Sequence, residues 1–131
     1  MPSRATAGSA GFDLQAALDA PLTLAPGKLA SVPTGVAVKL PQGSVGLLFG
    51  RSGLGVKHGV TLSNSVGVID SDYTGEIFVG LCNVSDEPYT IMPLDRIAQL
   101  VVASPLPVTL VVSDTLEETE RGSGGFGSTG R

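Results

Sequence analysis

Two glycine-rich loops of this chain carry charged side chains next to short apolar runs. Residues 7–14 read AGSAGFDL, and residues 50–55 read GRSGLG. In the second loop, Arg51 and Ser52 can present a guanidinium, a hydroxyl and backbone amides to an anion. This loop is not a P-loop, because it lacks the GKS/T ending. In the first loop, Asp13 begins an expected strand, although taken alone it reads as a turn acid that faces solvent.

A third loop, residues 64–76, carries a carboxylate that could act as a base. The apolar stretch Val66–Ile69 leads directly into Asp70, so partial burial could make Asp70 an acceptor of a proton from water. Asp72 would lie on the same side of a continuous strand, but the sequence Ser-Asp-Tyr-Thr-Gly indicates a turn that separates the two aspartates. The alternative is that both aspartates only form the turn.

An amide lies on a strand that is otherwise apolar. Strict alternation along residues 97–101 places Gln99 on the same side as Ile97 and Val101, which is the apolar side. A buried amide needs hydrogen-bond partners, so Gln99 either satisfies the backbone of a loop or reaches a ligand.

The C-terminal residues 121–131 read RGSGGFGSTGR. This segment has too little apolar surface to offset its ordering entropy, so we expect it to be disordered on its own. Phe126 nevertheless offers a stacking face and Arg121 a planar anion fork, and the small residues offer backbone and hydroxyl donors. Together these groups could close over a nucleotide. The alternative is a solvated Gly/Ser tail.

Composition restricts both the fold and the partners. The chain has 131 residues with 18 glycines, 9 prolines and 5% aromatic residues, which favours one domain of many short strands and turns. The net charge is −4 and the basic residues form no run, so nucleic acid is not an expected partner. There is no signal region and no apolar run of the roughly 18 residues that span a bilayer, so we expect no membrane association and a cytoplasmic location.

The single histidine and the single cysteine indicate little chemistry. His58 lies beside Lys57 in a polar turn, so a catalytic triad or a histidine-rich metal site has little support and surface exposure is expected. One cysteine allows no intrachain disulfide, and the apolar run around Cys82 predicts a buried, inert thiol.

Short β-favouring runs recur at intervals of roughly 8 to 12 residues, which indicates an antiparallel sandwich or barrel. Turn residues separate the runs, including a predicted break at Pro33-Thr34-Gly35. The best helical candidate is one or two turns over Ser52–His58. The expected strands are Leu22–Leu24, Leu29–Val32, Val36–Leu40, Val45–Phe49, Glu76–Leu81, Tyr89–Met92, Ile97–Val102 and Val108–Val112.

Taken in order, five segments resemble the motifs of the trimeric dUTPase family in its bacterial form. They read AGSAGFDL, RSGLG, GVIDSDYTGE, DRIAQL and RGSGGFGSTG, and the resemblance covers residues 2–131. It implies an all-β jelly-roll or β-clip antiparallel barrel, residues 1–120, that forms a homotrimer with sites shared between subunits. Residues 121–131 would then be a flexible Gly-rich arm that closes over a site on other chains. One departure is Pro93-Leu94-Asp95, where a Gly-Asp turn is usual.

The resemblance implies hydrolysis of dUTP to dUMP and pyrophosphate with Mg²⁺, which limits uracil incorporation into DNA and supplies dUMP for dTMP synthesis. Asp70 would deprotonate the attacking water, and Asp13 would hold the outer shell of the metal through water, as suits Mg²⁺. A tight turn at Gly67 would exclude the methyl group of thymine. The implied substrate contacts are Arg51, Ser52, Gly53, Lys57 and Gln99 to the phosphates, Asn64, Gly67 and Ile69 to uracil, Tyr73 beneath the deoxyribose, and Arg121, Phe126, Gly127, Ser128 and Thr129 from the arm.

Two alternatives to a dUTP diphosphatase stay open from the sequence. One is a deaminase of the same fold that acts on dCTP, and the uracil-type hairpin at residues 64–69 argues against it. The other is a catalytically silent, nucleotide-binding regulatory protein. Such a protein would have no need of the base Asp70.

Overall fold

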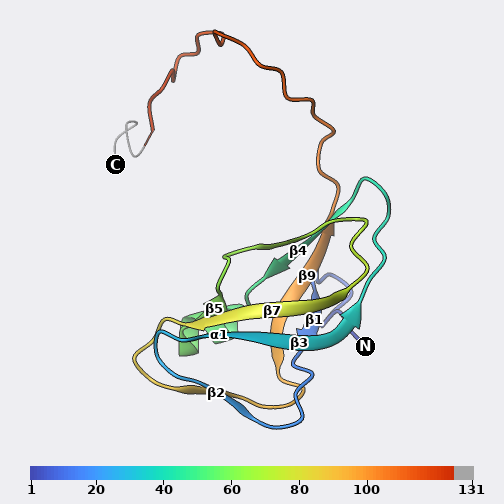
Figure 1. Cartoon of the computed structure of the whole chain (residues 1–131), viewed down its shortest axis with the longest axis vertical. Helices are drawn as coiled ribbons and strands as arrows, with labels where there is room; N and C mark the ends of the chain where they lie inside the picture. The colour runs from blue at the N-terminus through green and yellow to red at the C-terminus, as the bar shows by residue number, and fades with distance from the viewer. Residues whose placement is uncertain (126–131) are drawn as a thin grey trace.

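The computed structural model describes residues 1–125, which form short strands and one short helix (Figure 1). No helix within these residues is long and apolar enough to cross a membrane. The elements in chain order are β1 (Phe12–Gln15), β2 (Leu22–Leu24), β3 (Leu29–Ala37), β4 (Val45–Phe49), α1 (Ser52–His58), β5 (Val60–Leu62), β6 (Gly67–Ile69), β7 (Glu76–Asn83), β8 (Tyr89–Ile91) and β9 (Arg96–Ala103).

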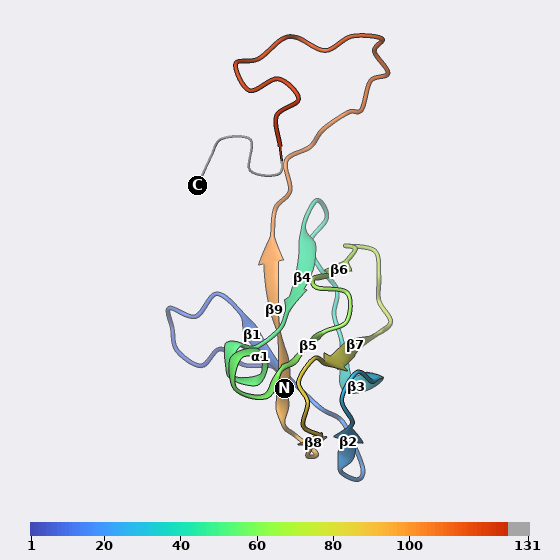
Figure 2. The same ribbon diagram turned by 90° about the vertical axis from the view of Figure 1, so that its left-hand side faces the viewer.

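The paired strands run antiparallel in three sheets. The largest has the order β1-β9-β4-β6, the second pairs β2 with β8, and the third has the order β3-β7-β5. Figure 2 shows β9 between β1 and β4, so two loops that are far apart in the sequence, before β1 and after β4, come to lie near the same strand. The predicted all-β antiparallel class is confirmed, as is the predicted helix.

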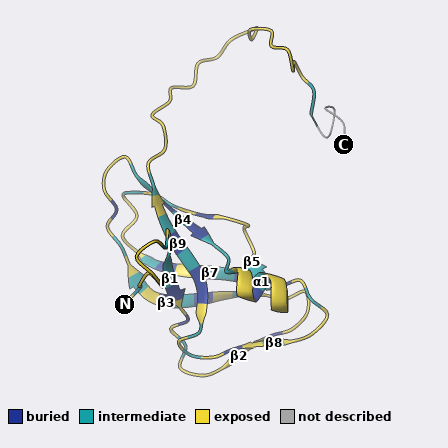
Figure 3. Cartoon of the chain, turned by 180° about the vertical axis from the view of Figure 1, so that it is seen from behind, coloured by how far each residue is buried: buried dark blue, intermediate teal, exposed yellow. Residues whose placement is uncertain are grey.

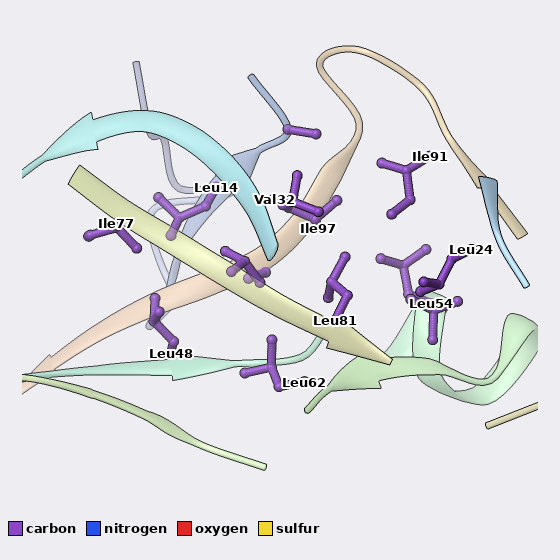
Figure 4. Packing of buried hydrophobic residues seen from close by; sticks show 14 of the residues in the cluster. Leu14, Leu24, Val32, Leu48, Leu54, Leu62, Ile77, Leu81, Ile91 and Ile97 are labelled. Atoms are coloured by element: carbon purple, nitrogen blue, oxygen red, sulfur yellow. The ribbon is translucent and has the colours of Figure 1, made fainter. Parts of the chain in front are cut away.

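The hydrophobic core lies between the sheets and is built from alternate residues of the strands. Along β7, Ile77, Val79 and Leu81 are each 1% exposed, whereas Phe78 is 53% exposed. Figure 4 shows the β7 side chains Ile77 and Leu81 in the cluster that includes Leu14 of β1. Burial of one such side chain stabilises the fold by about 1.5 to 3 kcal/mol. The buried members of this cluster all lie between residues 14 and 100, so the described segment beyond β9 adds nothing to it.

Strand β3 runs through the predicted break at residues 33–35, so the expectation of two separate strands there is wrong. The register with β7 shifts between Pro33 and Ala37, and Gly35 adopts the left-handed φ of 65° that this irregularity requires. Thr34 is buried and its hydroxyl donates to the Ile77 carbonyl at 2.7 Å. The irregular residues are therefore tied to β7, and the strand continues past them.

The predicted strand at Val108–Val112 is also wrong. After Ala103 the chain leaves the sheets, and it forms no strand up to residue 125 (Figures 1 and 3). The apolar side chains of residues 106–112 are exposed, with Leu110 at 96% and Val112 at 98%. A strand forms only where a neighbouring strand accepts its backbone hydrogen bonds. In the described chain this β-favouring segment has no such neighbour. Conversely, β5 and β6, of three residues each, were not predicted as strands.

The phase of β9 differs from strict alternation, because the strand contains a β-bulge. Leu14 pairs with Ala98, but the next residue of β1, Gln15, pairs with Arg96, so Ile97 is an extra residue. Ile97 and Ala98 are consequently both buried, at 1% and 0% exposed. The predicted placement of Gln99 on the side of Ile97 is therefore wrong, because Gln99 lies on the opposite, half-buried face.

The turn before β9 holds Leu94 in a left-handed conformation, with φ of 68°. The turn is fixed on both sides, because the Leu94 amide donates to the Ala16 carbonyl at 2.9 Å and the Met92 amide donates to Asp95 Oδ2 at 2.8 Å. A residue with a Cβ pays a steric penalty of about 1 kcal/mol or more in this region. The turn Pro93-Leu94-Asp95, which has Leu94 where a Gly-Asp turn is usual, therefore stores backbone strain at Leu94.

Replacing Leu94 by Gly should raise the free energy of unfolding by about 0.5 kcal/mol, since relief of the strain outweighs the greater entropy of glycine in the unfolded chain. Leu94 is 69% exposed, so little packing is lost. Urea denaturation with an unchanged slope measures the effect. The matched control is Met92→Gly in the same turn, at a residue without a positive φ, and it should destabilise. Equal destabilisation by both variants would contradict the prediction that the backbone at Leu94 is strained.

Candidate functional site

A first cavity of about 190 Å³ lies where β1, β9 and the start of α1 meet. Asp13 of β1 pairs with Gln99 of β9, and Gln99 also pairs with Phe49 at the end of β4. This double pairing brings the loop after β4 beside Asp13. The cavity is lined by Ala5, Ser9, Gly11, Asp13, Arg51, Ser52, Gly53, Arg96 and Gln99. The structure therefore brings together five residues that the sequence proposed for the metal and the phosphates: Asp13, Arg51, Ser52, Gly53 and Gln99.

Two arginines share one carboxylate in this cavity. Arg51 Nε lies 3.2 Å from Asp13 Oδ1, and Arg96 Nη1 lies 3.0 Å from Asp13 Oδ2. Arg51 Nη1 also donates to the Arg96 carbonyl at 3.1 Å. The Asp13 side chain is 18% exposed and that of Arg51 26%, so solvent screens this cluster only in part. Two guanidinium groups against one carboxylate leave an excess of positive charge, which suits an anionic ligand.

Gln99 completes the wall of this cavity through its amide. Its Nε2 donates to the Gly50 carbonyl at 3.1 Å, so the amide satisfies the backbone of a loop, one of the two roles considered from the sequence. A Cβ at Gly11 would lie 2.8 Å from Gln99 Oε1. Gly11 is therefore required for the close approach of the first loop to Gln99.

A second cavity, of about 250 Å³, contains the predicted base. Asp70 follows β6, and the Tyr73 amide donates to its carbonyl at 3.1 Å, which is the predicted turn. The Tyr73 hydroxyl donates to the Glu76 carbonyl at 2.8 Å, and a Cβ at Gly75 would lie 2.6 Å from that hydroxyl oxygen and 2.8 Å from the ring carbon Cζ. The lining residues are Val68, Ile69, Asp70, Tyr73, Glu76, Ile77 and Phe78.

Asp70 is exposed in the single chain, so the expected partial burial of its carboxylate is not provided by its own chain. Asp72 does not line the Asp70 and Tyr73 cavity. Asp72 lines a wider cavity of about 790 Å³ near Lys39, and Asp70 also lines this wider cavity. The predicted turn is present, but both aspartates line the wider cavity, so the turn does not separate them completely.

The hairpin between β5 and β6 turns at Ser63–Val66 rather than at Gly67. Ser65 has a left-handed φ of 63°, and the Val66 amide donates to the Asn64 carbonyl at 2.7 Å. Gly67 is instead part of β6 and pairs with Leu48, where a Cβ would lie 3.0 Å from the Leu48 Cβ. The expectation of a tight turn at Gly67 is therefore corrected, and the close approach of two strands is what requires glycine there. Asn64 is exposed at the tip, and Ile69 is half-buried.

Lys57 lies apart from the other residues proposed for the phosphates. It lines a third cavity, of about 510 Å³, with His58 and Tyr89, whose rings lie 4.7 Å apart. Burial, and to a smaller extent the Asp95 carboxylate, raises the pKa of Tyr89 above its ordinary value, so its hydroxyl stays protonated at neutral pH. His58 is exposed, as predicted, whereas Cys82 is half-buried rather than buried.

The described part of the arm makes hydrogen bonds that are local in the sequence. Arg121 Nε donates to the Gly124 carbonyl at 2.9 Å, and the Gly122 amide donates to the Thr119 carbonyl at 3.0 Å. Arg121 is exposed. The other proposed arm contacts lie outside the described residues: Phe126, Gly127, Ser128 and Thr129.

The cavity that holds Asp13 and Arg51 and the cavity that holds Asp70 and Tyr73 have no lining residue in common. One holds the cations, and the other holds Asp70 and Tyr73. Sequence reasoning missed Arg96 and Phe78 as lining residues. Arg96 stands three residues before Gln99, a spacing that puts it on the opposite face of a regular strand, so only the bulge could have revealed it.

The amino-acid sequence of this chain is similar to those of known dUTPases. A dUTPase family model matches residues 1–130. The deoxyuridine 5'-triphosphate nucleotidohydrolase of Desulfitobacterium hafniense is 51% identical over 99% of this chain and 87% of its own length. That of Ralstonia nicotianae is 49% identical over 100% of this chain and 89% of its own.

Solved structures extend the likeness to three dimensions. The dUTPase of Staphylococcus bacteriophage 80alpha with dUpNHpp has a TM-score of 0.89 at 31% identity, over 100% of this chain and 92% of that one. The dUTPase of Streptococcus mutans has a TM-score of 0.76 at 36% identity, over 83% and 88%. A mutant dUTPase of phage phi11 of S. aureus, which coordinates a structural Mg(II) ion, has a TM-score of 0.78 at 28% identity, over 90% and 92%.

Proposed function

Since the chain belongs to the dUTPase family and is a dUTP diphosphatase of all-β jelly-roll fold, we propose that Asp70 activates the attacking water in sites that a homotrimer shares. The observation that carries this proposal is the division of the single chain into two cavities. The guanidinium groups line one cavity and the base Asp70 lines the other. Hydrolysis of a triphosphate needs both at one phosphorus atom.

The exposed segment beyond β9 supports the same assembly. Leu106, Leu110 and Val112 are 84%, 96% and 98% exposed, and a soluble monomer rarely exposes so many neighbouring apolar side chains. A second copy of the chain would cover them and would lead residues 121–131 toward a site on other copies. Arg121 and the arm residues Phe126, Gly127, Ser128 and Thr129 would then close over the nucleotide, with the Phe126 ring on the uracil.

In the proposed reaction, Asp70 accepts a proton from water as that water attacks the α-phosphorus of dUTP, in line with the leaving pyrophosphate. Packing by a second copy would remove Asp70 from bulk water and fix its direction. Arg51, Ser52 and Gln99 would hold the phosphate chain from the other side, with Gly53 allowing close approach of its backbone. The Arg51 guanidinium matches a phosphate in geometry and charge.

The donor set fits a magnesium ion that is held mainly by the substrate. Within residues 1–125 no group of three His, Cys, Asp or Glu side chains could form a complete protein cage. Mg²⁺ keeps several of its waters and takes direct ligands from phosphates, so one carboxylate such as Asp13 suffices to receive those waters. When bound, the ion would neutralise charge on the triphosphate. Asp13 would orient its water shell.

Selection of the base would rest on the hairpin before Asp70. Uracil presents acceptor, donor and acceptor groups along its pairing edge, which the Asn64 amide and the backbone up to Ile69 can match. Cytosine presents the opposite polarity at two of these positions, and buried mismatched polar groups are costly. The Tyr73 ring, held through its hydroxyl by Glu76, would lie beneath the deoxyribose, where a 2′-hydroxyl would clash. In the cell this activity would limit uracil in DNA and supply dUMP in the cytoplasm.

The decisive assay incubates the purified protein with Mg²⁺ and equal concentrations of dUTP, UTP, dTTP or dCTP. Rapid release of pyrophosphate from dUTP, with dUMP as the other product and slow reaction of the rest, is the expected result. Release of ammonia from dCTP would favour the deaminase. Tight binding of dUTP without any product would favour a silent regulatory protein.

Replacing Gly11 by Ala should raise the KM for dUTP about tenfold, because the new Cβ would lie 2.8 Å from Gln99 Oε1 and displace an amide proposed to bind the phosphates. Steady-state kinetics measures the change. Gly8→Ala is the matched control in the same loop, because a Cβ at Gly8 meets nothing within 4 Å. Equal KM values for the two variants would remove Gln99 from the phosphate contacts.

A further inference from the structure

The bulge in β9 determines which face of the sheet carries Arg96. In a regular strand, Arg96 would alternate to the face opposite Gln99, which is the core. The extra residue Ile97 shifts this phase, because both Ile97 and Ala98 are directed into the core. Arg96 therefore emerges on the same face as Asp13 and Gln99 and lines their cavity. Bulges of this kind redirect a single side chain next to functional sites.

Arg96 contacts Asp13 through its side chain and Arg51 through its backbone carbonyl. Its Nη1 donates to Asp13 Oδ2 at 3.0 Å, and its carbonyl accepts from Arg51 Nη1 at 3.1 Å. Its own side chain is 52% exposed. Asp13 is therefore bound through both oxygens, Oδ1 to Arg51 and Oδ2 to Arg96.

In the proposed chemistry, the phosphates compete with Asp13 for the Arg51 guanidinium. Arg51 Nε is directed at Asp13 Oδ1, and this donor cannot serve Asp13 and a phosphate oxygen together. Asp13 Oδ1, once it has lost the Arg51 donor, would accept a hydrogen bond from a water of the metal instead. When the magnesium triphosphate arrives, both groups exchange one partner for another, and no charge is left unpaired.

From these contacts we infer that Arg96 is a positioning residue that holds Asp13 in place when Arg51 transfers to the phosphates. The inference rests on the proposed function of Arg51 and Asp13. Arg96 keeps its bond to Oδ2 through the exchange, so Oδ1 is presented in a fixed direction. Without Arg96, Asp13 would lose its only other guanidinium contact in the described chain. Its carboxylate would then either stay on Arg51 or turn into solvent.

Three variants test this role: Arg96→Gln, Arg96→Lys and the charge-matched control Lys28→Gln, in the exposed turn before β3. For each, dUTP hydrolysis is titrated with Mg²⁺, and the Kd of dUpNHpp is measured with Mg²⁺ and with EDTA. Arg96→Gln should raise the half-saturating Mg²⁺ concentration about tenfold or more. The tightening of dUpNHpp by Mg²⁺ should fall by a similar factor, with the Kd in EDTA unchanged. Arg96→Lys should restore part of the effect, because one ammonium can still hold Oδ2.

Two results would overturn the inference. An equal loss of dUpNHpp affinity with and without Mg²⁺ would make Arg96 a direct phosphate ligand. An unchanged Mg²⁺ titration would deny it any role. Thermal unfolding checks each fold, and Arg96→Lys decides the matter if Arg96→Gln unfolds. Failure of the proposed function can be told apart from failure of the inference about Arg96. In that case the parent chain and Lys28→Gln would release no pyrophosphate from dUTP.

Discussion

Replacing Asp70 by Asn should lower kcat for dUTP by about a hundredfold to ten-thousandfold, which is the usual contribution of a general base. Asparagine keeps the size of the side chain and its turn, in which the Asp70 carbonyl accepts from the Tyr73 amide. It cannot accept a proton from water. Binding of dUTP should therefore change little. Single-turnover release of pyrophosphate measures the chemical step, and equilibrium titration with dUpNHpp measures the affinity.

Asp72→Asn is the matched control, because it removes the same charge two residues later from the same turn. Asp72 does not line the cavity that holds Asp70 and Tyr73, so its replacement should leave kcat within a few-fold of the parent. If Asp70→Asn retained a comparable kcat, another group would have to be the base.

Deleting residues 121–131 should lower kcat/KM for dUTP about a hundredfold or more while the chain stays folded, because closing segments exclude water and complete the contacts to the substrate. The core cluster lies between residues 14 and 100. The described hydrogen bonds of Arg121 and Gly122 reach only Gly124 and Thr119, so none of them ties the arm to the core. Steady-state kinetics, with thermal unfolding and the mass of the assembly in solution, measures the effect.

A full-length chain with Phe126→Ala and Arg121→Gln is the control for the deletion, since it keeps the length of the arm and removes two of its proposed contact groups. It should reproduce most of the loss. Unfolding or dissociation of the shortened chain would instead make the segment structural. If sites are shared in a trimer as proposed, refolding the shortened chain together with Asp70→Asn should restore part of the activity, because mixed trimers would contain sites with an intact Asp70 and an intact arm. No recovery would argue against shared sites.

Several elements follow from local sequence because local rules decide them. The strand Val45–Phe49 and the helix Ser52–His58 were predicted with the bounds that the structure has. Each is a run of suitable residues between glycines or polar turns, so neighbours in the sequence suffice to specify it. The loops that carry Asp13, Arg51 and Asp70 were found for the same reason, since glycine next to polar groups is a local signal.

The errors occur where a distant partner decides the structure. Residues 108–112 have β-favouring side chains, but the described chain gives them no neighbouring strand. Pro33-Thr34-Gly35 reads as a break, yet Thr34 is bonded to Ile77 of β7 and the strand continues. Hydrogen-bond partners of a strand are remote in sequence, so propensity alone cannot say whether they exist.

By itself, the sequence determined the all-β class and named the chemical groups of the candidate site, because motif content and the spacing of turns are properties of the linear chain. Only the tertiary structure decided how those groups are distributed. It placed Asp70 and Arg51 in separate cavities, and it turned Arg96 toward Asp13 through the one extra residue Ile97. The physical reason is that the side chains of a strand alternate between its two faces. A shift of one residue therefore moves a side chain from the core to the site, and only the pairing with a distant strand sets that register.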